Sequence, residues 1–245
     1  MRPMKNVRNY VNMTETTSTN ALLKERIYKS SSPVFDVVTA DKQTSGRGRL
    51  GRSFFSPSGG AYFSAAYPLS GKEKNIPFLT LLAGLAVSES IRELTGENTL
   101  IKWPNDIFLN GKKLCGILTE LVTAQCGMHA VVGVGINLGV SAEEIPAELK
   151  DKMTSFAALG LPCPDRETLI KRAVEISDGY VYEKDLLNAV SDDILSALNE
   201  SSFLFGKNAV YEGRNVVCGR INPDGSINVT SGGNTEKVFS GEIVL

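Results

Sequence analysis

The chain has 245 residues, of which 42% are hydrophobic and 22% are charged, and its 26 lysines and arginines face 27 aspartates and glutamates for a formal net charge of −1. This balance argues against a generally basic nucleic-acid-binding protein, and no apolar stretch has the length of a membrane span. The length allows one large domain and one small domain, and the first twenty residues lack the apolar core of a secretory signal, so we expect a cytoplasmic protein.

The first part of the chain predicts helices and strands around one long loop. Capping residues from Ser18 introduce an amphipathic run, which predicts a helix ending near residues 30–33. A β-branched run favours a strand at residues 34–40, and the stretch that follows has too much Gly, Ser and Arg for regular structure. Residues 61–69 predict a further strand, and residues 77–94 predict a long buried helix.

The second part predicts a hairpin, a buried strand and a helical region. Residues 99–123 favour strands broken by a turn at Asn110-Gly111, because Asn-Gly is a strong hairpin signal. Residues 128–140 predict a buried strand and residues 143–199 predict mainly helix. We therefore expect an α+β catalytic domain at residues 1–200 and, from the short strands and turns that follow, a small antiparallel barrel at residues 201–245.

The cysteines and the single histidine do not suggest a metal or a catalytic dyad. The four cysteines lie far apart, without a C-x-x-C pair, at Cys115, Cys126, Cys163 and Cys218. We expect reduced and mostly buried thiols. His129 precedes an apolar run and is interpreted as a structural residue at a strand edge, which disfavours histidine-based triads.

The densest local signal is the segment Gly46-Arg47-Gly48-Arg49-Leu50-Gly51-Arg52. Glycines let backbone N–H groups approach an anion, and arginines supply permanently charged donors for phosphate or carboxylate. The segment is neither a P-loop nor a Rossmann turn. By itself it is equally consistent with a phosphate-binding loop and with a solvated or RNA-binding basic loop.

Two further segments carry candidate ligand-binding residues. Lys102-Trp103-Pro104-Asn105-Asp106 leads through the Asn-Gly turn to Lys113, so that two lysines on the arms of one hairpin could meet at a polyanion. Glycines in the apolar segment Gly133-Val134-Gly135-Ile136-Asn137 indicate either a close ligand or a β-bulge.

In order and spacing, these segments resemble the biotin protein ligases. The resemblance runs from Thr16 to Leu245 and includes the Ser-Thr-Asn helix start, the G-R-G-R loop, K-W-P-N-D, the K-L-x-G-I-L-x-E segment, G-x-G-I-N and a terminal S-G-E. It implies a mixed-sheet catalytic domain, distantly similar to class II aminoacyl-tRNA synthetases, followed by an SH3-like β-barrel. It also implies that biotin is activated with ATP and Mg²⁺ and is then transferred to a lysine of a biotin carboxyl carrier protein.

The resemblance assigns roles residue by residue. Those implied for biotin binding are Ser18, Thr19, Asn20, Gln43, Gly46, Arg47, Gly48, Arg49, Lys113, Gly116, Gly133 and Gly135. Those implied for ATP or the adenylate are Arg49, Arg52, Phe54, Lys102, Asn105, Asp106 and Asn137. Lys113, Arg49 and Lys102 would serve in catalysis, and Asp106 is a candidate metal ligand.

The loop departs from the usual family pattern at two positions. After the last arginine, where many members have Trp, this chain has Ser53-Phe54-Phe55, and Leu50 replaces a basic residue. In this chain the aromatic contact to the ligand would therefore come from a smaller ring, that of Phe54.

Three alternative functions compete with this interpretation. A lipoate or octanoate ligase or transferase shares the fold, but its arginine-glycine-glycine loop and nearby histidine signature are missing here. A biotin-responsive repressor would need an N-terminal helix-turn-helix domain of about 60 residues, whereas 17 residues precede Ser18, so we expect a short form that does not bind DNA. A non-catalytic RNA-binding module would bind in a strongly salt-dependent way without biotin. The sequence leaves the oligomeric state open between monomer and homodimer.

Overall fold

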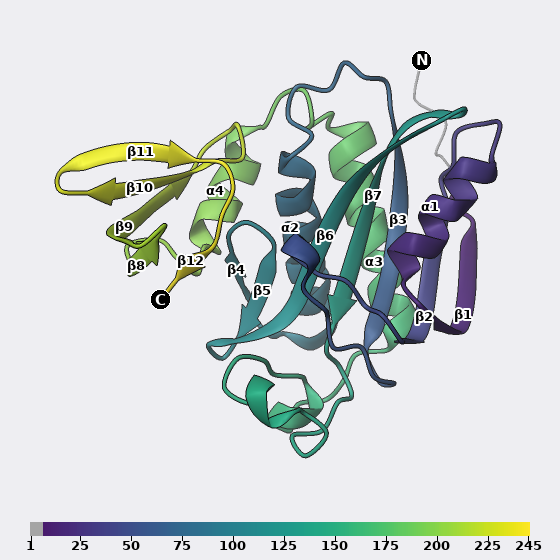
Figure 1. Ribbon diagram of the computed structural model, residues 1–245, viewed down its shortest axis with the longest axis horizontal. Coiled ribbons are helices and arrows are strands. Elements are labelled where there is room, and N and C mark those ends of the chain that lie inside the picture. The colour runs from purple at the N-terminus through teal and green to yellow at the C-terminus, as the bar shows by residue number, and fades with distance from the viewer. Residues whose placement is uncertain (1–6) are drawn as a thin grey trace.

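A seven-stranded mixed sheet forms the centre of the protein in the computed structural model, which describes residues 7–245 (Figure 1). Its strand order is β1-β2-β3-β7-β6-β5-β4; β1 and β2 pair in parallel, and the other neighbours are antiparallel. The strands are β1 (Tyr10–Thr16), β2 (Val37–Gln43), β3 (Ala61–Leu69), β4 (Leu100–Lys102), β5 (Asp106–Leu109), β6 (Lys112–Ala124) and β7 (Gly127–Ile136).

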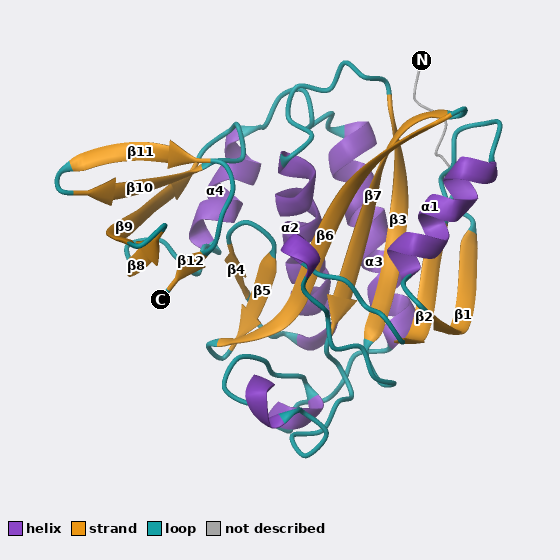
Figure 2. Cartoon of the chain, in the orientation of Figure 1, coloured by secondary structure: helices purple, strands orange, loops and turns teal. Residues whose placement is uncertain are grey.

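Helices cover both faces of this sheet (Figure 2). Helix α1 (Thr19–Lys29) packs on one face, and α2 (Phe78–Thr95) and α3 (Arg166–Asp178) pack on the other. Successive strand residues point to opposite faces, so Val37 joins the core beneath α2 and α3 while Val38 joins the core beneath α1. This double burial explains why β3 and β7 are buried at consecutive positions rather than at alternate ones.

The connection after β7 contains short 3₁₀ turns at Ala147–Leu149 and Ala157–Leu159, and a π-helical turn at Gly179–Glu183 follows α3. Helix α4 (Asp192–Glu200) then leads to a second, five-stranded antiparallel sheet in the order β11-β10-β9-β8-β12. Its strands are β8 (Asn208–Tyr211), β9 (Arg214–Ile221), β10 (Ile227–Ser231), β11 (Asn234–Val238) and β12 (Ile243–Val244).

A buried tryptophan joins the two sheets. Trp103 is 2% exposed, and its indole Nε1 donates to the carbonyl of Gly225, in the turn before β10, over 2.9 Å. A buried indole N–H needs such a partner. This hydrogen bond therefore fixes the C-terminal sheet beside the strand ends that carry Lys102 and Asp106.

The predicted α+β fold with a mixed sheet, followed by a small antiparallel β unit, is confirmed. Ser18 caps α1, since its hydroxyl accepts from the N–H of Ala21, and Asn110 and Gly111 form the turn with φ values of 49° and 78°. The exact division at residues 200 and 201 stays a prediction, and the first six residues of the predicted catalytic domain lie outside the described part.

Two strands differ from the prediction. The strand expected at residues 34–40 is β2 at Val37–Gln43, so it extends to the Gln43 that faces the site. Strand β1 was missed because it is a largely polar edge strand, and it is defined by its parallel pairing with β2 rather than by its own composition.

The histidine and the cysteines are structural, as predicted. His129 lies within β7 rather than at a sheet edge; it is fully buried and its Nε2 accepts from the N–H of Val34 over 3.0 Å. Burial lowers the pKa of His129, so the ring is neutral at pH 7. All four cysteines are free, and Cys163 is the exposed one. Within residues 7–245 no helix is both long enough and apolar enough to span a bilayer.

Candidate active site

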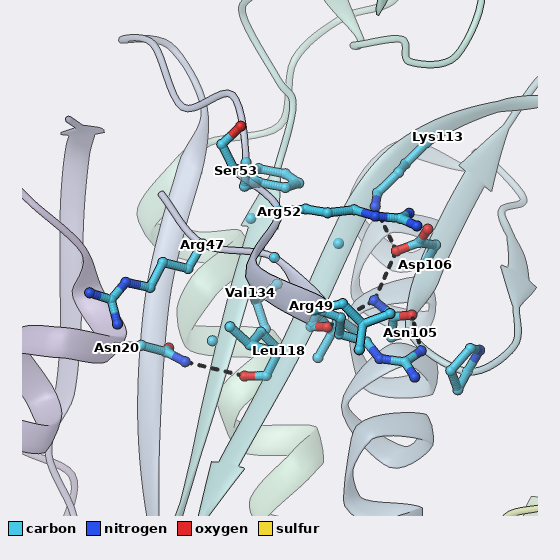
Figure 3. A pocket seen from close by; sticks show the side chains of 18 of the residues that line it. Asn20, Arg47, Arg49, Arg52, Ser53, Asn105, Asp106, Lys113, Leu118 and Val134 are labelled. Atoms are coloured by element: carbon cyan, nitrogen blue, oxygen red, sulfur yellow. Dashed lines mark hydrogen bonds and ion pairs between the residues drawn. The ribbon is translucent and has the colours of Figure 1, made fainter. Parts of the chain in front are cut away.

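One cleft brings together most of the sequence-predicted site residues (Figure 3). It lies on the same face of the sheet as α1, beyond the N-terminus of that helix, and encloses about 1020 Å³ including its open mouth. The predicted residues that line it are Ser18, Thr19, Asn20, Gln43, Arg47, Gly48, Arg49, Arg52, Phe54, Lys102, Asn105, Asp106, Lys113, Gly116, Gly133 and Gly135.

Two predicted residues lie outside this lining. Gly46 belongs to the internal packing of its loop, since a Cβ there would lie 2.5 Å from the carbonyl oxygen of Phe54. Asn137 is 2% exposed, and its side-chain N–H donates to the carbonyl of Thr154 over 3.1 Å. Both residues therefore shape the walls of the cleft from behind.

Three glycines form the base of the cleft, and we call Gly116, Gly133 and Gly135 the glycine platform. Gly116 of β6 pairs with Gly135 of β7, and Gly133 pairs with Leu118. Their missing side chains admit neighbours from other segments: a Cβ on Gly133 would lie 2.1 Å from Asn20 Oδ1, and one on Gly135 would lie 2.4 Å from the Phe54 ring. Backbone approach of this kind is the reason for glycine in these strands, and the bulge interpretation is not needed.

Polar side chains from α1 and β2 form one end of the cleft. The backbone N–H of Thr19, in the first turn of α1, donates to Gln43 Oε1 over 2.9 Å, and Gln43 Nε2 donates to Ser56 Oγ over 3.0 Å. The amide of Gln43 is thus fixed in one orientation. First-turn N–H groups of a helix also present positive dipole to any ligand placed there.

Cationic side chains form the other end. Lys113 Nζ lies 2.7 Å from Asp106 Oδ1, the same oxygen accepts from Asn105 Nδ2 over 3.1 Å, and Arg49 donates to Asn105 Oδ1 over 3.0 Å. Figure 3 shows this chain of contacts across the cleft. Burial lowers the pKa of Lys102, because the charged ammonium loses water there.

Both predicted lysines line the cleft, but they do not come from one hairpin. Lys102 ends β4 and Lys113 lies in β6, on either side of β5, which begins at Asp106. The register pairs Lys102 with Asp106 and Asp106 with Gly116. One carboxylate thus separates two ammonium groups, which reduces their mutual repulsion.

The arginine-glycine loop is itself a small ordered ring. Arg47 and Ser53 form an antiparallel bridge, and the N–H of Gly48 donates to the carbonyl of Arg52 over 2.7 Å. The turn at its tip places Leu50 at φ 56°, with 80% of the side chain exposed. The loop therefore presents its arginines to the cleft while its apolar tip points to solvent.

The C-terminal sheet contributes residues that the sequence did not assign. Gly241, Glu242 and Ile243 line the cleft, and Arg52 forms a two-pronged ion pair with Glu242, with Nη1 to Oε1 at 3.0 Å. The Arg52 hydrogen bonds and charge hold the pKa of Glu242 below its usual value. The terminal S-G-E of the family pattern could have pointed to Glu242, but the motif does not say which part of the fold this residue contacts.

The side chains of the cleft do not form a metal site by themselves. Within residues 7–245 no group of three or more His, Cys, Asp or Glu side chains could hold an ion. Asp106 is already paired with Lys113. A cation here would depend on ligands brought by a substrate, with Asp106 as the candidate carboxylate.

Comparison with known proteins agrees with this geometry. Residues 11–137 match the model of the biotin/lipoate A/B protein ligase family. The chain is 41% identical to the bifunctional ligase/repressor BirA of Bacillus subtilis over 144 residues, which is 58% of this chain and 44% of that protein. The chain thus aligns with less than half the length of this curated relative.

Two other relatives align over nearly the whole chain. The biotin–[acetyl-CoA-carboxylase] ligase of Mycobacterium tuberculosis is 29% identical over 94% of this chain and 86% of that protein. A structure of the biotin protein ligase from Aquifex aeolicus, in complex with biotin and ATP, superposes with a TM-score of 0.78 at 31% identity, covering 96% of this chain and 97% of that one.

The glycine platform gives a direct test of the site geometry. We expect Gly135→Ala to destabilise the protein by about 1–3 kcal/mol, because the new methyl group overlaps the Phe54 ring. The double variant Gly135→Ala/Phe54→Ala should show less than the sum of the two single losses in urea unfolding. Additive losses would mean that Phe54 does not rest on Gly135 in solution.

Proposed function

The chain belongs to the biotin/lipoate A/B protein ligase family, and from this premise we propose that it is an ATP-dependent biotin protein ligase. The observation that supports this proposal is a single cleft (Figure 3): fixed amide and hydroxyl groups lie at one end, glycines form the base, and the cationic side chains Arg49, Arg52, Lys102 and Lys113 lie at the other end. Such a cleft suits a ligand with a polar head, an apolar body and an anionic tail that must meet a polyphosphate.

Biotin would lie over the base of the cleft, beside the Phe54 ring that packs on Gly116 and Gly135. Its ureido head would face Ser18, Thr19, Asn20 and the Gln43 side of the cleft, and its apolar ring and chain would contact Leu118. Its carboxylate would then reach Lys113. Since Lys113 is paired with Asp106 in this structure, the incoming carboxylate takes the place of Asp106 as the partner of the ammonium.

The first step joins two anions. An oxygen of the biotin carboxylate attacks the α-phosphorus of ATP, the bond from that phosphorus to the bridging oxygen breaks, and pyrophosphate leaves. Lys102, Lys113 and the arginines of the loop would reduce the repulsion and stabilise the leaving group. ATP would enter as its Mg²⁺ complex, and Mg²⁺ supplies further neutralisation of the phosphates.

The second step transfers the acyl group. The amine of an acceptor lysine attacks the acyl carbon of biotinyl-adenylate, a C–N bond forms, the C–O bond to AMP breaks, and the amine releases a proton. A biotin carboxyl carrier domain of a carboxylase is the proposed acceptor. Until it arrives, the loop held by the Gly48–Arg52 and Arg52–Glu242 contacts would exclude water from the adenylate.

ATP–pyrophosphate exchange tests the proposed function. The purified chain should exchange labelled pyrophosphate into ATP when biotin and Mg²⁺ are present, because adenylate formation is reversible. Lipoate and octanoate serve as parallel substrates. Exchange with either of these, and none with biotin, would assign the chain to the other branch of the family.

Lys113→Ala should abolish most of the exchange activity. One positioned charge of this kind contributes about 10²–10³-fold to the rate. Lys112→Ala is the matched control, since the adjacent Lys112 side chain donates to the carbonyl of Lys150 and lies outside the lining of the cleft. Equal exchange by the two variants would remove Lys113 from its role.

Arg49→Gly should release biotinyl-adenylate from the enzyme. The change removes the hydrogen bond from Arg49 to Asn105 and adds backbone freedom at the loop tip. Free adenylate is measured by chromatography after a single turnover without acceptor, with Arg49→Lys as the charge-retaining control. Leakage equal to that of the parent would show that the loop does not retain the intermediate through Arg49.

A further inference from the structure

We infer that Glu120 is a positioning residue for ligand recognition: it fixes the direction of a hydrogen-bond chain through Asn20 and Ser64, which leaves the Thr19 hydroxyl oxygen free to accept an N–H from the ligand. This inference rests on the proposed function, because it concerns how the polar end of the cleft selects biotin. It assigns a role to a residue that does not itself line the cleft.

Glu120 lies between the cleft and the core beneath α1. It follows Leu118 on the same face of β6 and precedes the buried Val122. One carboxylate oxygen accepts from Lys24 Nζ over 2.7 Å, and the other accepts from Asn20 Nδ2 over 2.8 Å. Burial acts to raise the pKa of Glu120, but these hydrogen bonds and the nearby positive charges lower it overall, so the group is ionised at pH 7.

The carboxylate fixes the orientation of the Asn20 amide. Asn20 Nδ2 donates both to Glu120 and to the Leu118 carbonyl, the latter over 3.3 Å (Figure 3). Rotating the amide by 180° would place its oxygen against two acceptors. Asn20 Oδ1 therefore faces Ser64, whose Oγ lies 2.5 Å away.

The orientation of Asn20 determines where the hydroxyl protons lie. Ser64 has one proton, and it is donated to Asn20 Oδ1 because that oxygen is buried and needs a donor. Ser64 has no second proton for Thr19, so the 2.7 Å contact between the two hydroxyl oxygens takes the Thr19 proton, in preference to the longer 3.3 Å contact of Thr19 Oγ1 with Gln43 Oε1. With its proton committed, the Thr19 hydroxyl can only accept from a ligand.

This arrangement favours a particular ligand chemistry. The ureido group of biotin carries N–H donors, whereas the hydrocarbon and disulfide ends of octanoate and lipoate have none to give. A ligand without such a donor covers the Thr19 oxygen without giving it a hydrogen bond, which is costly because Thr19 is only 4% exposed. Glu120 is at the far end of this series of hydrogen bonds from Thr19, and through it Glu120 contributes to the choice of substrate.

The test compares Glu120→Ala with Glu120→Gln. Glu120→Ala removes the acceptor for Asn20, and the dissociation constant for biotin in calorimetry should rise about tenfold, with the KM for ATP unchanged. Glu120→Gln can still accept from Asn20 and should restore the affinity to near that of the parent. Lys24→Ala is the matched control, because it breaks the ion pair to Glu120 but leaves the Asn20 bond.

A second variant checks the chain of protons. Ser64→Ala should weaken biotin binding to a similar degree, and Glu120→Ala/Ser64→Ala should lose little more than either change alone. Additive losses, or equal losses from Lys24→Ala and Glu120→Ala, would overturn the inference.

If Glu120→Ala does not fold, Glu120→Gln and Ser64→Ala replace it in the same comparison. The inference then requires near-parental biotin binding by Glu120→Gln and weakened biotin binding by Ser64→Ala. A parent that binds no biotin would instead refute the proposed function.

Discussion

The register of β6 on β7 is the constraint on which the site depends. It places Gly116 opposite Gly135, beside the Leu118–Gly133 pair, so that one half of a sheet face carries almost no side chains while the other half is covered by α1. A shift by one residue would turn valines and Ile117 into the cleft and turn the glycines into the core. The glycines leave room on this surface for side chains from the helix N-terminus and the loop, and Asn20 and Phe54 pack directly on it.

The cations of the cleft come from segments far apart in the chain, and Lys113, Arg49 and Arg52 have an anionic or polar partner before any ligand enters. Asp106 holds Lys113 and lies near Lys102, Asn105 holds Arg49, and Glu242 holds Arg52. Collecting positive charge without partners would be costly in a partly buried site. When an anionic ligand binds, it replaces the present partners of these cationic side chains. The side chains are thus already held in place without the ligand.

The C-terminal sheet is part of this site rather than an appendage. Its turn at Gly225 accepts from the buried Trp103, and its Glu242 holds the arginine-glycine loop. Both contacts act on segments that line the cleft. At the polar end of the cleft, the side chains are held by residues of the large sheet, through the series of hydrogen bonds from Glu120 to Thr19.

The sequence by itself determined the main elements, the Asn110-Gly111 turn and most of the cleft residues, because caps, turns and the ordered set of motifs are local signals. It could not determine β1, whose strand exists through pairing with β2, nor the positions of Gly46 and Asn137 behind the cleft wall. The opposing strands of Lys102 and Lys113, the Arg52–Glu242 pair and the Glu120–Asn20 bond were decided only by tertiary structure. Each joins residues whose distance in space is set by sheet register and sheet packing, and no local pattern encodes that distance.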